Sequence, residues 1–172
     1  MGVLLGIERS RGRCRKGQRL CTLKPFYRGA KVTTMGAISQ RGVLALDTLN
    51  GSMKGDDFRT FIRTQLVPKL WPGAVVVMDN LAAHKVKGVE ALIEKAGARI
   101  LYLSPYSPDF NPIEMLWSQL KAFLRRFRPK TSVAVTQLLK LAVTLSDREH
   151  FQNWYTYCCY WALSFKRVIA RI

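Results

Sequence analysis

Two carboxylates in the middle of the chain, Asp79 and Glu114, have the residue type and the surroundings for metal-dependent chemistry. Asp79 directly follows a continuous apolar run, residues 74–78, that is typical of a β-strand buried on both faces. Glu114 follows a second short apolar strand, residues 99–103, and the loop after it. If these strands are parallel neighbours, both carboxylates lie at the same edge of the sheet. Two carboxylates without a thiol or imidazole partner favour a hard cation, Mg²⁺ or Mn²⁺, which would polarise a phosphodiester.

Each of these residues also has an ordinary structural interpretation. An aspartate after a buried strand is often the N-cap of the next helix. Asn111, Pro112 and Glu114 have the spacing of a capping box, and on spacing alone we favour capping over metal binding for Glu114. His84 is by default a histidine on a helix surface or lightly buried. Trp117 is expected in the core, because it shares an apolar helix face with its neighbours.

The elements expected around these residues form a mixed sheet flanked by helices, which is an α/β layer fold. The expected strands are residues 19–26, 31–38, 43–49, 74–78 and 99–103, with a turn at 40–42. The expected helices run from Asp56 or Asp57 to Trp71, over 83–96, from the proline-rich loop 104–112 to about Phe127, and over 132–145 and 147–168. No linker or repeat divides the chain, so residues 1–172 are expected to form a single domain with C-terminal helices from about residue 131.

Composition excludes several classes of protein. The 172 residues are 48% hydrophobic and 10% aromatic, which excludes a disordered basic tail. No apolar run approaches the length of a membrane span, and the N-terminus lacks the order of charges of a signal peptide. We therefore expect a soluble, cytoplasmic protein. Its four cysteines are not spaced for a metal clip and are expected to be reduced.

A formal net charge of +17, from 28 Lys plus Arg against 11 Asp plus Glu, implies a polyanionic partner. Nucleic acid is the commonest such partner, and the alternative is a merely solvated basic surface. Three separate basic clusters favour a surface that follows phosphates. The clusters are Arg9, Arg11, Arg13, Arg15, Lys16 and Arg19; Lys121, Arg125, Arg126, Arg128 and Lys130; and Lys166, Arg167 and Arg171.

Two stretches of sequence carry a specific resemblance. They are VVVMDNLAAHK, residues 75–85, and YLSPYSPDFNPIEMLWSQLK, residues 102–121. Together they resemble the catalytic core of DDE-type transposases, in particular bacterial insertion-sequence transposases related to the mariner group. The 34 residues between Asp79 and Glu114 match the interval between the second and third acidic residues of that group. Looser similarity at residues 15–19 and 51–53 extends the resemblance over most of the chain.

The resemblance implies an RNase H-like fold that cleaves DNA at the terminal inverted repeats of a mobile element and joins it to target DNA. In that family three carboxylates hold two divalent metal ions, Mg²⁺ or Mn²⁺. Asp79 and Glu114 match the second and third, so both are the implied catalytic and metal-binding residues. The motif positions expected to orient the acids or the DNA are Asn80, His84, Pro105, Tyr106, Ser107, Pro108, Asn111 and Pro112. The expected DNA contacts are Arg9, Arg11, Arg13, Arg15, Lys16, Lys85, Lys121, Arg125 and Arg126.

Two features of that family have no counterpart in the sequence: the N-terminal helix-turn-helix, and the first acid, in an Asp-Glu pair that ends the first core strand. Residues 1–3 resemble those just after that pair, and Glu8 lies among arginines with no strand leading to it. We therefore expect the sheet to lack its first central strand and catalysis to be weak or absent unless a companion polypeptide supplies it.

The alternative is a non-catalytic, basic DNA-binding remnant or regulator of an intact transposase. Binding of structured RNA is a third hypothesis. From the family we also expect a homodimer, and a bacterial, nucleoid-associated location.

Overall fold

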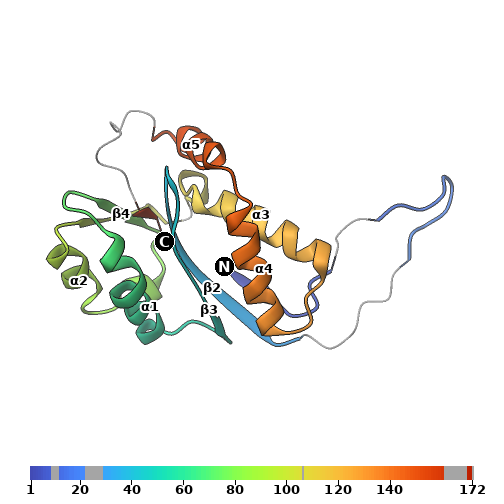
Figure 1. Ribbon diagram of the computed structural model, residues 1–172, viewed down its shortest axis with the longest axis horizontal. Coiled ribbons are helices and arrows are strands. Elements are labelled where there is room, and N and C mark those ends of the chain that lie inside the picture. Colours follow the sequence, from blue (N-terminus) through green and yellow to red (C-terminus); the bar gives the residue numbers. More distant parts are fainter. Residues whose placement is uncertain (9–11, 22–28, 106, 161–169, 172) are drawn as a thin grey trace.

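One mixed sheet runs through the centre of the molecule, with helices on both faces (Figure 1). This computed structural model describes residues 1–8, 12–21, 29–105, 107–160 and 170–171. The strands are β1 (Gly2–Leu4), β2 (Lys31–Ser39), β3 (Gly42–Asn50), β4 (Val75–Met78), β5 (Arg99–Tyr102) and β6 (Ala170–Arg171). Their order is β1-β2-β6-β4-β5, and β3 pairs with the other edge of β2. The expected α/β layer fold is therefore confirmed.

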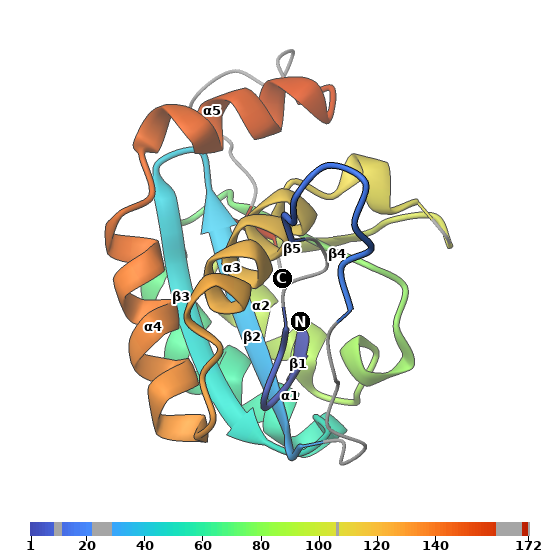
Figure 2. The same ribbon diagram turned by 90° about the vertical axis from the view of Figure 1, so that its right-hand side faces the viewer.

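The long antiparallel hairpin of β2 and β3 is close to the prediction (Figure 2). The two strands are joined at Gln40 and Arg41, where the sequence predicts a turn. The preceding prediction, a strand over residues 19–26, is wrong for residues 19–21, which lie in no strand. Residues 22–26 lie outside the described part of the chain.

β4 and β5 are parallel neighbours, as the argument for a shared edge requires. All four residues of β4 are buried, and they alternate between the two faces of the sheet. Val75 and Val77 pack in one apolar core, and Val76 and Met78 pack in the other. β5 is less buried than the sequence predicts, because it lies at the end of the strand order and Leu101 is half exposed.

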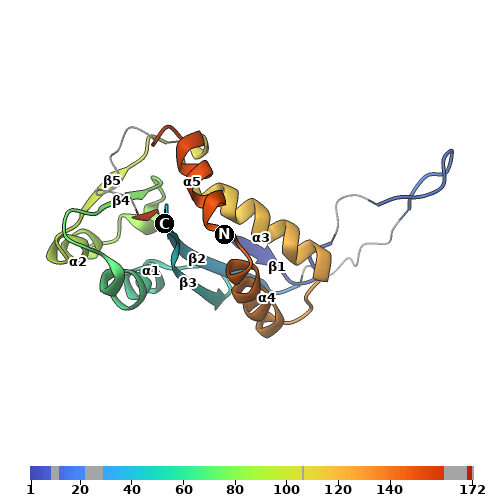
Figure 3. The same cartoon turned by 45° about the horizontal axis from the view of Figure 1, so that its top comes forward.

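The helices cover the two faces unequally (Figure 3). They are α1 (Gly55–Phe61), α2 (Val89–Lys95), α3 (Ile113–Phe127), α4 (Ser132–Thr144) and α5 (Arg148–Tyr157). α1 and α2 lie on one face, while α3, α4 and α5 bury their apolar residues on the other. Tyr155 of α5 reaches the sheet, where its hydroxyl donates to the carbonyl of Ile38 at 2.9 Å. None of the helices in the described ranges is long and apolar enough to cross a bilayer.

Three of the predicted helices differ from the observed ones. The helix expected over 83–96 is only a 3₁₀ turn, Ala82–His84, followed by α2, because Gly88 adopts a left-handed conformation with φ of 93° between them. α1 begins at Gly55 and Asp57 accepts the Lys54 N–H at 2.8 Å, so the expected cap is the third residue of the helix. α5 ends at Tyr157, short of the expected residue 168, and residues 161–168 lie outside the described ranges.

Candidate catalytic site

Asp79 is the residue directly after β4, at the carboxyl end of a fully buried strand. Its Oδ1 accepts a hydrogen bond from the Leu81 N–H at 3.2 Å, which forms a tight turn rather than the N-cap of α2. The same oxygen lies 2.5 Å from Nδ1 of His84. The two atoms are in close contact, although the direction of the ring is not that of a hydrogen bond, and the contact is an ion pair when the imidazole is protonated. Both partners use Oδ1, and no described residue engages Oδ2.

His84 is buried, with 6% of its surface exposed, and both its ring and its backbone make contacts. The ring stacks on Phe58 of α1, with centroids 4.4 Å apart. Its backbone carbonyl accepts a weak hydrogen bond from the Tyr102 hydroxyl at 3.4 Å. His84 is therefore not the surface or lightly buried histidine that we expected by default. Its imidazole contacts Asp79 and also packs against Phe58 in the core beneath α1.

The pKa of Asp79 is lower than the ordinary value for an aspartate. Partial burial alone would raise this pKa, but the contact with His84 and the Leu81 N–H together outweigh burial. The carboxylate is therefore ionised over the whole neutral range, which a metal ligand requires.

Glu114 lies in the first turn of α3, and the capping interpretation that we favoured on spacing is wrong. The Asn111 N–H donates to the carbonyl of Pro108 at 2.8 Å, and the N-cap residue is Pro112, which offers no side-chain cap. The Glu114 side chain is exposed, and no described hydrogen bond or ion pair engages its carboxylate. The glutamate is therefore not occupied by stabilising the helix end.

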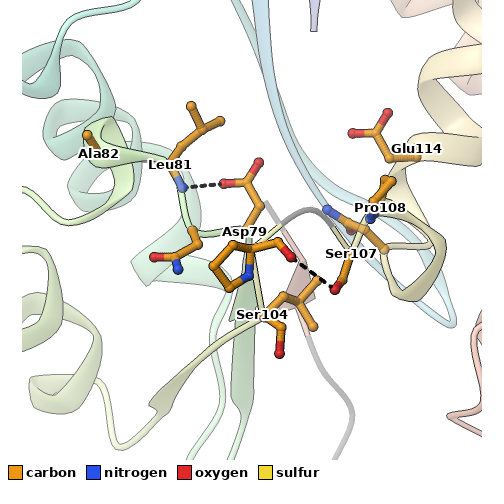
Figure 4. A pocket seen from close by; sticks show the side chains of 11 residues that line it. Asp79, Leu81, Ala82, Ser104, Ser107, Pro108 and Glu114 are labelled. Atoms are coloured by element: carbon orange, nitrogen blue, oxygen red, sulfur yellow. Dashed lines mark hydrogen bonds between the residues drawn. The ribbon is translucent and has the colours of Figure 1, made fainter.

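Asp79 and Glu114 line one open pocket of about 470 Å³. Figure 4 shows the Glu114 side chain reaching from α3 toward the side of the pocket that holds Asp79. The motif positions that also line this pocket are Asn80, Pro105, Ser107, Pro108 and Asn111. Tyr106 lies outside the described residues. The structure thus brings together the two predicted acids and most of the loop expected to orient them.

A second cavity, of about 240 Å³, adjoins the same two carboxylates from the side of β2. Its walls include Thr34 and Gly36 of β2, His84, and Lys121 of α3. Met1 also lines it, and burial lowers the pKa of the Met1 amino group to about 6 against the attraction of the Glu114 carboxylate. The carboxylates therefore line two adjoining spaces, one on the side of the 104–112 loop and one on the side of β2.

Residues 1–134 match the family described as DDE superfamily endonuclease. The chain belongs to this family. No curated protein matches the DDE chain.

Solved structures of the Mos1 mariner transposase are similar to the DDE chain in fold. A Mos1 paired-end complex with the left transposon end has a TM-score of 0.74 at 18% identity, covering 93% of this chain and 53% of that one. A Mos1 paired-end complex with Mn has a TM-score of 0.72 at 18% identity, covering 94% and 52%. The Mos1 catalytic domain has a TM-score of 0.63 at 18% identity, covering 74% and 69%. The RNase H-like fold is confirmed, and the DDE chain spans about half the length of the two complexes.

The two carboxylates of the DDE chain fit a hard divalent cation. Oδ2 of Asp79 and the whole Glu114 carboxylate are available as oxygen ligands in one pocket. No group of three or more His, Cys, Asp or Glu side chains gathers in the described ranges. The remaining ligands of a cation would therefore come from water or phosphate, which is how Mg²⁺ is commonly held.

The predicted DNA-contacting residues fall into two places on the DDE chain. Lys121 lines the second cavity together with the carboxylates, and Lys85 directly follows His84, with its Nζ 5.6 Å from the centroid of the Tyr102 ring. Arg125 and Arg126 follow along α3. Arg13, Arg15 and Lys16 are exposed on an arm, residues 12–21, that extends away from the body (Figure 1). Arg9 and Arg11 lie outside the described residues.

Sequence reasoning missed Thr34 and Phe58 as parts of the site. The Thr34 hydroxyl is buried with no described hydrogen-bond partner and lines the second cavity. Thr34 lies in a strand that also contains Lys31, Thr33 and Ser39, so its residue type alone gave no distinct signal. Phe58 carried no such signal, because its role arises only when α1 packs against the turn that contains His84.

Proposed function

We propose that this chain is the catalytic portion of a DDE transposase, which cleaves DNA strands at the ends of a mobile element and transfers them to a target. One observation carries the proposal: Asp79 and Glu114 line the same pocket, and each keeps carboxylate oxygens that no described residue uses. Two Mos1 structures similar in fold were solved with Mn and with Mg, which supports a divalent cation at this position.

A bound Mg²⁺ or Mn²⁺ ion would supply Lewis-acid polarisation of a phosphodiester and of the attacking water or hydroxyl. The chain's own residues prepare the place for it. His84 and the Leu81 N–H hold Oδ1 of Asp79 and keep the carboxylate ionised, which directs Oδ2 to the pocket. Lys121 places positive charge in the cavity that both carboxylates line, where the phosphate backbone of DNA would lie.

The natural DNA substrates that we propose are the terminal inverted repeats and the target DNA, and we propose a homodimer as the assembly. The basic arm, residues 12–21, and the basic residues of α3, Lys121, Arg125 and Arg126, would then bind DNA without recognising its sequence. Contacts from Lys and Arg to phosphate carry no information about the bases.

The experiment measures two properties of the purified chain: Mn²⁺ binding by isothermal titration, and nicking of supercoiled plasmid with Mn²⁺ or Mg²⁺. We expect Asp79→Asn and Glu114→Gln each to weaken Mn²⁺ binding by at least about tenfold, because each removes a charged ligand. Asp109→Asn, in the same loop but outside the pocket lining, is the matched control and should bind Mn²⁺ like the wild type. Nicking that persists unchanged in Asp79→Asn would overturn the proposal.

A second candidate function is supported by the number of carboxylates. With two acids gathered in the described residues, the chain could bind DNA without cutting it, as a non-catalytic regulator. That function predicts DNA binding that falls steeply with salt and is the same in wild type, Asp79→Asn and EDTA-treated protein. Filter binding at several salt concentrations, with duplex DNA and RNA in competition, distinguishes the two functions.

A further inference from the structure

α4 carries apolar side chains on two sides. Its inner side is buried: Val135 and Leu139 are 0% exposed and pack in the core with α3 and the sheet. On its outer side, Val133 is 64%, Leu141 48% and Leu145, the C-cap residue, 66% exposed. These three side chains, the outer row, are separated by multiples of four residues, so they lie along one stripe of the helix surface.

The outer row is unusual for the surface of this chain. Ten large hydrophobic side chains are exposed in the described ranges, and three of them belong to this row. α4 packs over β3, where the hydroxyls of Thr48 and Thr136 lie 2.9 Å apart, and β3 is at the end of the sheet opposite to β5 (Figure 2). A helix with apolar residues on both sides is typical of one that is covered on both sides.

The charge around the outer row also differs from that of the whole chain. Residues 130–149 contain three Lys plus Arg and two Asp plus Glu, whereas the whole chain has a formal net charge of +17. Lys140 lies on the flank of α4 that faces β3, where it lines a cavity together with Asp47. The outer row is therefore a poor surface for DNA, and two copies of the chain can meet there without strong repulsion.

The two ends of the outer row carry opposite charge. Lys130, which is exposed, precedes Val133 by three residues, and the exposed residues 147–149 after Leu145 comprise two acids and one arginine. In a second copy that lies antiparallel, about a two-fold axis near residue 139, Val133 would meet the partner's Leu145 and Lys130 would meet the partner's Glu149. The same surface then complements itself in its apolar and in its charged positions.

We propose that the outer row of α4 is the contact between two copies of this chain, paired antiparallel about a two-fold axis. The row is short, so the dimer forms reversibly as the protein concentration rises. The contact rests on the homodimer of the proposed function, but it needs neither metal nor DNA. Its failure would therefore leave the roles of Asp79 and Glu114 untouched.

Sedimentation velocity of the full chain, without metal or DNA, measures the dimer over a range of protein concentrations. We expect the wild type to dimerise, and Leu141→Gln/Leu145→Gln to raise the dissociation constant of the dimer by at least about a hundredfold, because four leucines are lost from a two-fold contact. Leu101→Gln is the matched control, because Leu101 is 51% exposed but lies on β5, and this variant should dimerise like the wild type.

Charge reversal tests the antiparallel arrangement even if the leucine variant does not fold. Lys130→Glu and Glu149→Lys should each weaken the dimer about threefold at low salt, because each brings like charges together at both ends of the contact. The combined variant should recover the wild-type dissociation constant. A monomeric wild type, a dimer that the leucine substitutions leave unchanged, or no recovery in the combined variant would overturn the proposal. Mn²⁺ titration of the same variants, which should match the wild type, shows separately whether the catalytic site stands.

Discussion

The two carboxylates of the site are positioned in different ways. Asp79 is held by direct polar contacts, through the Leu81 N–H and a histidine that is itself stacked on Phe58. Glu114 has no such contact and depends on the packing of α3 as a whole, with Trp117 set against Gly36 of the sheet. One acid is therefore fixed before any cation arrives, while the other can adjust its side chain on a rigid helix.

The largest effect that we expect comes from disturbing the contacts that hold Asp79 in place. Phe58 is fully buried, so Phe58→Ala should lower the free energy of unfolding by about 3–5 kcal/mol and release the His84 ring. Urea unfolding measures this change. Phe127→Ala is the matched control, because Phe127 is half exposed at the end of α3 and its loss should cost less than about 1 kcal/mol. Similar losses for both variants would mean that α1 does not hold the turn containing His84.

The support of Glu114 is tested at Gly36, where the sheet and α3 approach closely. A Cβ atom at Gly36 would lie 2.6 Å from the Trp117 ring and 3.2 Å from Leu46, so α3 would have to shift. We expect Gly36→Ala to cost about 1–3 kcal/mol of stability and to weaken Mn²⁺ binding by displacing Glu114. Gly2→Ala, whose new methyl group meets the flexible end of the Lys31 side chain, should change neither property. Unfolding and titration calorimetry on both variants give the comparison.

The difference between the two supports also explains what the sequence could predict. The apolar face of α3, which includes Ile113, Trp117 and Leu120, follows the helical period, and the structure buries all three. β4, the strand that ends before Asp79, and its neighbour β5 were also predicted from their apolar runs. Local patterns of this kind need no knowledge of distant partners.

Contacts between distant segments could not be predicted in this way. The stacking of His84 on Phe58 joins residues 26 positions apart, and nothing in their spacing indicates it. The Asn111–Glu114 spacing favoured a cap that the structure does not use, since Pro108 supplies the acceptor for the Asn111 N–H. The pairing of β6 with both β2 and β4 also joins distant segments, and no local pattern at residues 170–171 predicts it.

Substitutions of His84 should have a smaller effect, and they test the positioning of Asp79 separately from that of Glu114. His84→Ala removes the partner of Asp79 Oδ1 and leaves α3 in place, so we expect Mn²⁺ affinity to fall by about tenfold. His84→Asn, which keeps a short polar side chain, should recover part of this loss. His150→Ala, an exposed histidine on α5, should bind Mn²⁺ like the wild type. Unchanged affinity in His84→Ala would show that the Leu81 N–H alone is enough to position Asp79.

The charge on Asp79 should also make stability depend on pH. Because its pKa is lowered in the folded chain, the ionised carboxylate contributes stability above its unfolded pKa of about 4, and this contribution is lost as the pH falls through the folded pKa. The unfolding free energy of Asp79→Asn should therefore decline less steeply than that of the wild type below about pH 4. Urea titrations across this range test the sign, and parallel profiles would remove the stabilising role of the contact.

The smallest expected effect lies on the other acid. Glu114→Gln should change the free energy of unfolding by less than about 0.5 kcal/mol, because the side chain is exposed and no described hydrogen bond or ion pair engages it. The same variant should nevertheless lose Mn²⁺ affinity as strongly as Asp79→Asn. A purely structural glutamate would not give this combination, in which the free energy of unfolding is unchanged and Mn²⁺ affinity is lost. A stability loss above about 1 kcal/mol would instead return Glu114 to the role of a helix cap, which its spacing in the sequence first indicated.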